Sequence, residues 1–118
     1  MPALALISDL AMQSQVAGAA ARAGSELAVV ASEDALVAAA ENLRPTLVIV
    51  DLSHPGLDPG RLMERLEPLL PPEAATLAFG PHVHKQRLAA AEAAGFGTVI
   101  SRGQFHAGME EILRHRGT

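Results

Sequence analysis

Five short apolar runs alternate with helix-like segments along the chain. The third run, from Thr46 to Asp51, consists of aliphatic, mostly β-branched residues and ends abruptly on a carboxylate. An unbroken apolar run of this length indicates a strand buried on both faces, as in the middle of a parallel sheet. The other predicted strands are Leu4–Ser8, Leu27–Ala31, Ala75–Phe79 and Val99–Ile100.

Helical patterns and helix-ending residues fill the segments between these runs. Ser32 and Asp58 are suited to cap the starts of two helices, and Gly24 is suited to end an earlier one. Pro68 ends or kinks the third helix, because proline removes a backbone donor. The predicted helices are Ala11–Ala23, Glu33–Leu43, Gly60–Glu67, Lys85–Ala94 and Phe105–Arg114.

Strict alternation of strands and helices predicts an α/β fold. Each helix must cross back over the sheet in a right-handed connection, which gives a doubly wound, five-stranded parallel sheet with helices on both faces. A chain of 118 residues supports one core of this kind, so we expect a single domain over residues 1–118.

Composition excludes several classes of function. The formal net charge is -4 and the sequence pI is about 5.7, so we expect no direct binding of nucleic acid or of an anionic membrane. Cysteine is absent, which excludes disulfides and thiolate metal sites. The first residues lack a basic region, and no apolar run reaches membrane-spanning length, so we expect a soluble cytoplasmic domain.

The candidate chemistry lies where strands end. Asp51 closes the third strand, and Asp9 follows the first, so both are expected at the carboxyl edge of the sheet, where open α/β sheets bind ligands. Each residue also has a structural interpretation. Asp51 could be a solvated carboxylate that ends a strand, and Asp9 could cap the first helix.

Several residues in joint placement resemble the receiver domain of bacterial response regulators. They are Asp9, Asp51, Pro55, the Gly80-Pro81 pair after the fourth strand and Arg102 after the fifth. The resemblance covers essentially the whole chain and implies the flavodoxin-like strand order 2-1-3-4-5. In that family the central aspartate accepts a phosphoryl group from a histidine kinase.

The resemblance also implies a candidate magnesium site. Asp9, Asp51 and the backbone carbonyl of Ser53 would supply its oxygen ligands. Mg²⁺ would provide positive charge for phosphoryl transfer, which depends mainly on positioning and electrostatics. Gly80 and Arg102 stand where the family has a Ser or Thr and a Lys that contact the phosphoryl oxygens.

Four departures from the family pattern indicate a degenerate site, that is, a pseudo-receiver. Ser8 replaces one carboxylate of the acidic pair, and losing about 2 kcal/mol of attraction would weaken Mg²⁺ binding on the order of thirtyfold. Gly80 lacks the hydroxyl of the family's Ser or Thr. Arg102 carries a planar guanidinium where the family's Lys has a compact ammonium. Val99 stands where the family often has a switching aromatic residue.

The leading hypothesis is therefore a signalling and protein-interaction module of two-component type that is not an enzyme. Its partner would be a histidine kinase or a downstream signalling protein. The module would bind this partner, or form a homodimer, through the face made by the fourth helix, the fifth strand and the fifth helix. The alternative is a working phospho-accepting receiver that uses Asp51 and weakly bound Mg²⁺. Candidate contact residues are Arg87, Glu92, Arg102, Gln104, Glu110 and Arg114.

Three histidines suggest weaker alternatives. His82 and His84 resemble a metal pair but lack a third ligand of evident spacing, so a zinc site is disfavoured. His54 lies in an Asp-x-x-His-x-Gly segment, which does not match the cobalamin-binding pattern Asp-x-His-x-x-Gly. A small α/β enzyme with His54 or His84 as base has little support, because the sequence places no nucleophile beside either residue.

Overall fold

Strands and helices alternate strictly in the structure, a computed structural model that describes residues 2–116. Residues 1 and 117–118 of the predicted domain lie outside the described residues. The strands are β1 (Ala3–Leu6), β2 (Leu27–Val30), β3 (Leu47–Asp51), β4 (Ala75–Gly80) and β5 (Thr98–Ser101). The helices are α1 (Leu10–Ala23), α2 (Glu33–Leu43), α3 (Pro59–Leu66), α4 (Lys85–Ala94) and α5 (Arg102–Arg116), with a short 3₁₀ helix, η1 (Glu67–Leu69), after α3.

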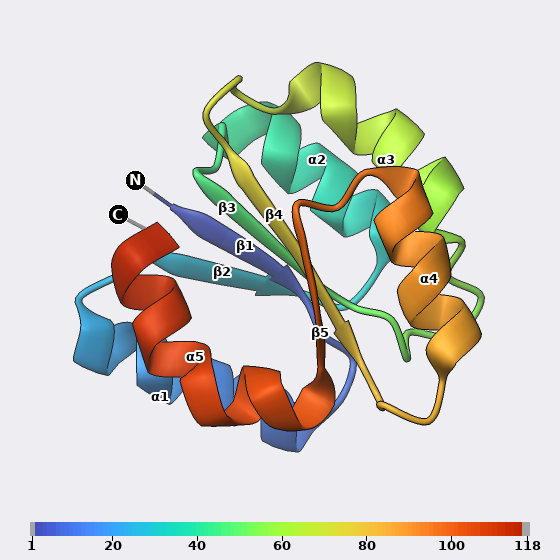
Figure 1. Ribbon diagram of the computed structural model, residues 1–118. Helices are drawn as coiled ribbons and strands as arrows, with labels where there is room; N and C mark the ends of the chain where they lie inside the picture. The colour runs from blue at the N-terminus through green and yellow to red at the C-terminus, as the bar shows by residue number, and fades with distance from the viewer. Residues whose placement is uncertain (1, 117–118) are drawn as a thin grey trace.

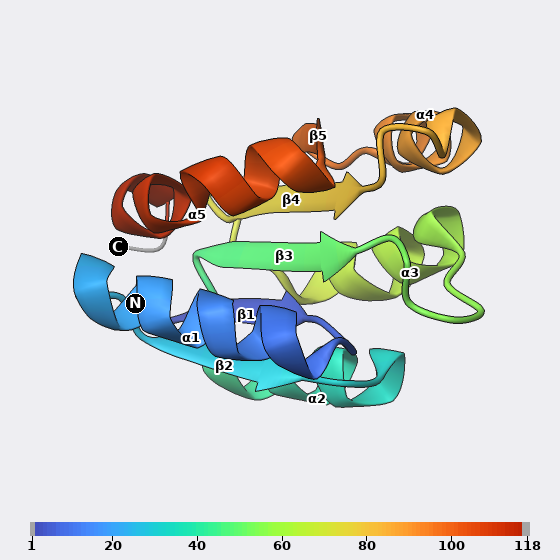
Figure 2. The same ribbon diagram turned by 90° about the horizontal axis from the view of Figure 1, so that it is seen from below.

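The five strands form one parallel sheet in the order β2-β1-β3-β4-β5, which confirms the predicted fold class. Leu6 of β1 pairs with Val50 of β3, and Asp51 of β3 pairs with Phe79 of β4. This register brings the carboxyl ends of β1, β3 and β4 to the same edge of the sheet. Figure 2 shows the arrowheads of β3 and β4 pointing toward that edge.

Helices cover both faces of the sheet (Figures 1 and 2). Helices α1 and α5 lie on one face, and α2, α3 and α4 lie on the other. Successive residues of β1 point to opposite faces: Ala3 and Ala5 join the core under α1 and α5, and Leu4 and Leu6 join the core under α2, α3 and α4. Two-sided burial therefore explains why β1 and β3 are continuously apolar.

Helix starts follow the predicted capping residues in most places. The Ser32 hydroxyl accepts the Ala35 amide, and Asp58 accepts the Gly60 amide, as the sequence indicated. Helix α5 begins at Arg102 and not at Phe105. The reason is a capping box, in which the Gln104 amide donates to Ser101 Oγ and the Ser101 amide donates to Gln104 Oε1, at 3.1 and 2.9 Å.

Several other boundaries also differ from prediction, and those of β1 and β5 are the ones that lie next to the candidate site. Strand β1 ends at Leu6, so Ser8 lies in the connection to α1 and not in the strand. Strand β5 spans Thr98–Ser101 and is longer than the predicted Val99–Ile100, because its flanking polar residues continue the pairing with β4. Among residues 2–116, no helix has both the length and the hydropathy that crossing a membrane requires.

Removing the Phe105 ring should destabilise the domain strongly. Phe105 is fully buried on α5 and stacks on Phe79 of β4, with ring centroids 4.1 Å apart. We expect Phe105→Ala to lower the free energy of unfolding by about 3–5 kcal/mol, measured by chemical denaturation, because it leaves a cavity between helix and sheet. The matched control Val83→Ala, at a site 68% exposed, should cost less than about 0.5 kcal/mol. Equal losses in the two variants would contradict this account of the core.

Candidate functional site

Asp51 is a buried carboxylate at the carboxyl end of β3. The residue is 4% exposed, and among residues 2–115 it is the only polar residue buried to this extent. The Ser53 amide donates to Asp51 Oδ1 at 2.9 Å, and the Leu52 amide donates to the Phe79 carbonyl at 2.8 Å. These two bonds fix the backbone that carries Asp51. Within the described part of the chain, Asp51 forms no ion pair.

Asp9 caps a helix, which is one of the two roles that the sequence left open, and it also forms an ion pair that the sequence did not predict. Its Oδ1 accepts the Ala11 amide at 2.9 Å, so it caps α1. Its Oδ2 accepts a hydrogen bond from Arg102 Nη2 at 2.8 Å, so it also forms an ion pair across the sheet edge. Arg102 is therefore directed toward the candidate site, as the resemblance implied, but its partner is Asp9.

The ion pair changes the titration of Asp9. The hydrogen bond from Arg102, followed by that from the Ala11 amide, lowers the pKa of Asp9 below its ordinary value. A group whose pKa is lowered by folding stabilises the folded state above its unfolded pKa. This contribution is lost as the pH falls through the lowered, folded value.

The predicted magnesium ligands do not form a complete donor set. Asp9 already has an arginine partner, and Ser8 supplies a hydroxyl where a second carboxylate would be needed. The Ser53 amide donates to Asp51 Oδ1, so one of the two Asp51 oxygens already accepts a hydrogen bond. Mg²⁺ prefers several oxygen ligands in an octahedral arrangement. The side chains as arranged therefore do not fit a tight magnesium site.

The position of Gly80 is closely bordered by Leu52. A Cβ atom at position 80 would lie 3.3 Å from Leu52 Cβ, 3.6 Å from Leu52 Cδ1 and 3.8 Å from Leu88 Cδ2. Leu52 is 3% exposed and belongs to the core under α2, α3 and α4. A Ser or Thr at position 80 would therefore require Leu52 to move by a few tenths of an ångström. Arg87 Nη1 of α4 also donates to the Leu52 carbonyl, at 3.3 Å.

A serine and a histidine that the sequence could not connect lie in direct contact. Ser8 Oγ is 2.6 Å from His54 Nδ1, although 46 positions separate the two residues. The contact joins the β1–α1 connection to the β3–α3 connection. The sequence alone placed no nucleophile beside His54, and the structure places the Ser8 hydroxyl there. The missed signal was that both residues closely follow strands that are neighbours in the predicted order.

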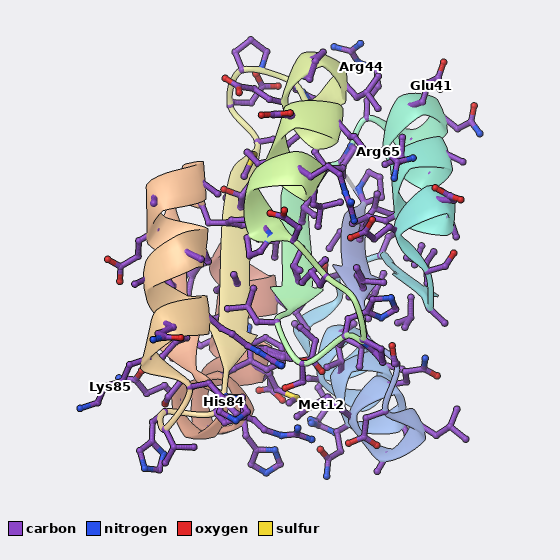
Figure 3. The ribbon with its side chains drawn as sticks, turned by 90° about the vertical axis from the view of Figure 1, so that its right-hand side faces the viewer. Met12, Glu41, Arg44, Arg65, His84 and Lys85 are labelled. Atoms are coloured by element: carbon purple, nitrogen blue, oxygen red, sulfur yellow. The ribbon has the colours of Figure 1, made fainter. Side chains whose placement is uncertain are left out.

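The remaining histidines do not assemble a metal site. No group of three His, Cys, Asp or Glu side chains within residues 2–116 is arranged to hold a metal ion. Figure 3 shows His84 at the same end of the molecule as Met12, and Arg44 at the opposite end. An open hollow of about 490 Å³ adjoins the ion pair. It is lined by Asp9, Ala11, Met12, Gln15, Pro81, His82, Arg102, Gly103 and His106.

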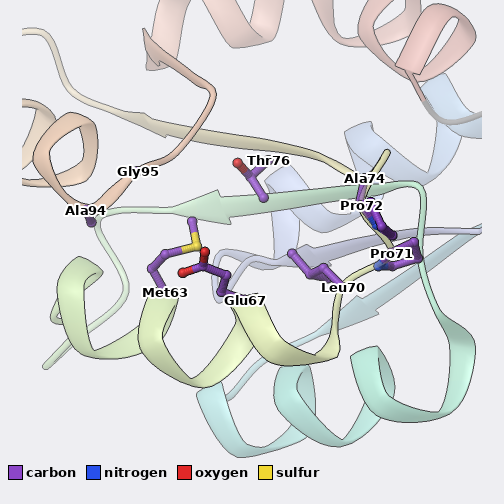
Figure 4. Close-up of a pocket in the computed structure, with 9 residues that line it drawn as sticks. All are labelled: Met63, Glu67, Leu70, Pro71, Pro72, Ala74, Thr76, Ala94 and Gly95. Carbon is purple, nitrogen blue, oxygen red and sulfur yellow. The ribbon is translucent and has the colours of Figure 1, made fainter.

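A second hollow, of about 390 Å³, lies at the other edge of the sheet (Figure 4). It is bounded by α3, η1 and the start of β4, so it is remote from the edge that carries Asp51. Met63 and Glu67 point into it in Figure 4, and Glu67 is its one charged lining residue. The lining residues are Met63, Glu67, Leu70, Pro71, Pro72, Ala74, Thr76, Ala94 and Gly95.

Comparisons with known proteins identify the fold. No protein-family model matches the chain, and a search of curated proteins finds no match in sequence. Among solved structures, the receiver domain of the sensor histidine kinase PA1611 from Pseudomonas aeruginosa, crystallised with a magnesium ion in its active-site cleft, has a TM-score of 0.80. It is 16% identical, and the alignment covers 98% of this chain and 95% of that one.

Two further structures share this architecture. The chemotaxis response regulator CheY4 of Vibrio cholerae has a TM-score of 0.79 and 16% identity, with 96% of this chain and 95% of that chain covered. A CheY-like protein, TadZ, from Pseudomonas aeruginosa has a TM-score of 0.73 and 23% identity, with 99% of each chain covered. At such low identities the likeness establishes the fold, which is that of CheY-like receiver domains.

Replacing Arg102 should raise the pKa of Asp9. In Arg102→Ala the carboxylate loses its arginine partner and keeps the Ala11 amide, so we expect the pKa to move part of the way back to its ordinary value. An NMR titration of the Asp9 side-chain carboxyl carbon measures the change. Arg61→Ala is the control, because Arg61 pairs with Glu33. An Asp9 pKa that is equal in the wild type and in Arg102→Ala would show that the ion pair does not form in solution.

Proposed function

We propose that this chain is a receiver-like signalling module that acts by binding proteins and does not run a magnesium-dependent phosphorylation cycle at Asp51. The ion pair between Asp9 and Arg102 carries the proposal. In this pair Asp9 and Arg102 bind each other. The family resemblance assigns the acid to the metal ion and the cation to the phosphoryl group. We further propose that the module is not an enzyme.

Phosphoryl transfer to a carboxylate depends on concentrated positive charge. The transition state carries charge on three oxygens, and a bound Mg²⁺ usually neutralises most of it. In this chain Arg102 neutralises Asp9 instead, and Ser8 adds no charge. Both side chains of the pair are well exposed to solvent, so the strength of the ion pair is not the obstacle. The obstacle is that Asp51 is the one carboxylate left for a metal.

The residues that would transmit phosphorylation are also altered. Gly80 offers no hydroxyl to a phosphoryl oxygen, and Leu52 borders the space in which that side chain would lie. Val99 cannot act as a switching aromatic residue. The planar guanidinium of Arg102 differs in reach and shape from the ammonium group of a lysine. These features support a module whose surface does not respond to a phosphorylated Asp51.

Side-chain contacts link the loops around the site without a metal ion. The Ser8–His54 contact joins the β1–α1 loop to the β3–α3 loop, and the Asp9–Arg102 pair joins the β1–α1 loop to α5. A metal held by both acids would bridge the first two of these loops. We propose that direct hydrogen bonds provide that bridge here and keep the edge of the sheet in one arrangement.

The proposed partner surface is the exposed face of α4. Most predicted contact residues on the last helices have partners within the chain: Arg102 pairs with Asp9, and Glu110 pairs with Arg22. On α4 the exposed positions combine three alanines with charged residues. They are Lys85, Gln86, Arg87, Ala89, Ala90, Glu92 and Ala93. Small side chains on a helix allow close approach, so this face fits a second copy, a histidine kinase or a downstream signalling protein.

Phosphoryl analogues should not occupy Asp51. We expect the wild-type domain, incubated with millimolar Mg²⁺ and beryllofluoride, to give the same ¹H–¹⁵N NMR spectrum as the domain with Mg²⁺ alone. A small phosphodonor should likewise give no increase in intact mass. NMR and mass spectrometry are required, because the chain contains no tryptophan or tyrosine to report binding by fluorescence.

The Asp51→Asn variant is the matched control for both measurements. Spectral changes or a mass increase that appear in the wild type and not in this variant would refute the proposal. That result would favour the alternative function, a working phospho-accepting receiver. The alternative draws its support from one observation, the retention of a buried carboxylate at the end of β3.

A charge placed on the α4 face should impair association. We expect Ala93→Glu to reduce self-association, measured by sedimentation velocity at several concentrations, or partner capture in a pull-down. Ala93 is exposed, and alanine and glutamate both favour helices, so the fold should persist. Ala21→Glu, an exposed position on α1, is the control. A monomeric wild type that captures no partner, or an Ala93→Glu variant that associates like the wild type, would exclude this surface.

A further inference from the structure

The Ser8 hydroxyl and the His54 imidazole are in contact at the carboxyl edge of the sheet. The distance between Ser8 Oγ and His54 Nδ1 is 2.6 Å, which is a hydrogen bond. Ser8 is exposed, so its hydroxyl is accessible, and His54 is half-buried. A serine hydroxyl is weakly nucleophilic by itself and becomes reactive when a neighbouring imidazole accepts its proton.

Backbone hydrogen bonds hold both residues in place. Next to Ser8, the Ile7 amide donates to the Val30 carbonyl at 3.1 Å, and Asp9 is fixed by its cap and its ion pair. The His54 amide donates to the Asp51 carbonyl at 3.1 Å, and the His54 carbonyl accepts the Leu57 amide at 3.2 Å. The two side chains therefore meet because the backbones of their loops are fixed, which is the condition for a prearranged pair.

The geometry points to Ser8 as a site of covalent acylation with His54 as its base. In this step Ser8 Oγ attacks the carbonyl carbon of an ester or thioester, and His54 Nδ1 takes the hydroxyl proton. The tetrahedral intermediate then expels the alkoxide or thiolate, which receives the proton from the imidazolium. The products are acyl-Ser8 and the free alcohol or thiol. The pair requires the tautomer of His54 that carries its proton on Nε2.

Charge at this edge selects a neutral electrophile. Asp51 lies three residues before His54 and forms no ion pair within residues 2–116. Its negative charge disfavours an anionic phosphoryl donor and does not oppose a neutral acyl group. His54 Nε2 has no carboxylate partner among the described residues. We therefore expect a single modification of the chain and not repeated turnover, so this inference does not depend on the proposed role of Asp51.

The test is stoichiometric labelling with p-nitrophenyl acetate, a neutral activated ester. We expect release of p-nitrophenolate together with one acetyl group, which peptide mapping by mass spectrometry places on Ser8. Ser8→Ala should abolish this adduct. His54→Gln should slow its formation on the order of tenfold or more, because the base is lost. Ser14→Ala, an exposed serine on α1, is the control and should label at the wild-type rate.

Two measurements separate a reactive pair from a merely structural contact. Thermal melting tests whether His54→Gln remains folded, and ¹⁵N NMR of His54 reports which ring nitrogen carries the proton. The inference is overturned if Ser8 is not acylated in the wild type, if a folded His54→Gln variant labels at the wild-type rate, or if the proton resides on Nδ1. Acylation spread equally over Ser8 and Ser14 would also overturn it.

Discussion

Burial of both faces of the parallel sheet is the constraint on which the rest of this structure depends. Strands β1 and β3 are covered by α1 and α5 on one side and by α2, α3 and α4 on the other. Parallel pairing requires every connection to cross over the sheet, so all five strands end at one edge. Residues that are distant in sequence are thus brought together there. The Asp9–Arg102 pair spans 93 positions for this reason.

Three contacts at this edge join positions that are far apart in the sequence. Arg102 meets Asp9, Ser8 meets His54, and Leu52 borders Gly80. The first two link the β1–α1 loop to α5 and to the β3–α3 loop, and neither requires an ion or a phosphoryl group. Under the proposed function, these contacts would hold the loops in one arrangement.

Much of the fold was predictable because hydrophobic periodicity and capping chemistry are local. The apolar run that ends at Asp51 fixed the central strand, and Ser32 and Asp58 capped helices where expected. The start of α5 was missed because its capping box involves Gln104, a residue that also suits a helix interior. Strand ends were the other local error, since Ser8 lies beyond the last residue of β1.

The candidate site was predictable in its location and not in its bonding. The ends of adjacent strands placed Asp9 and Asp51 at one edge, which the strand order and register confirm. Whether Arg102 contacts a phosphoryl position or Asp9 depends on side-chain reach, which periodicity does not encode. The Ser8–His54 contact likewise depends on how two loops fold above their strands. Sequence patterns describe strands and helices better than they describe such loops.

The contact between Leu52 and the space beside Gly80 couples two positions of the chain. A single substitution that introduced a hydroxyl at position 80 would meet a neighbour 3.3 Å away and crowd the core under α4. A smaller residue at position 52 would make room for it, and that change alone would leave a void. Substitutions at the two positions are therefore expected to be non-additive, each costing less in the presence of the other.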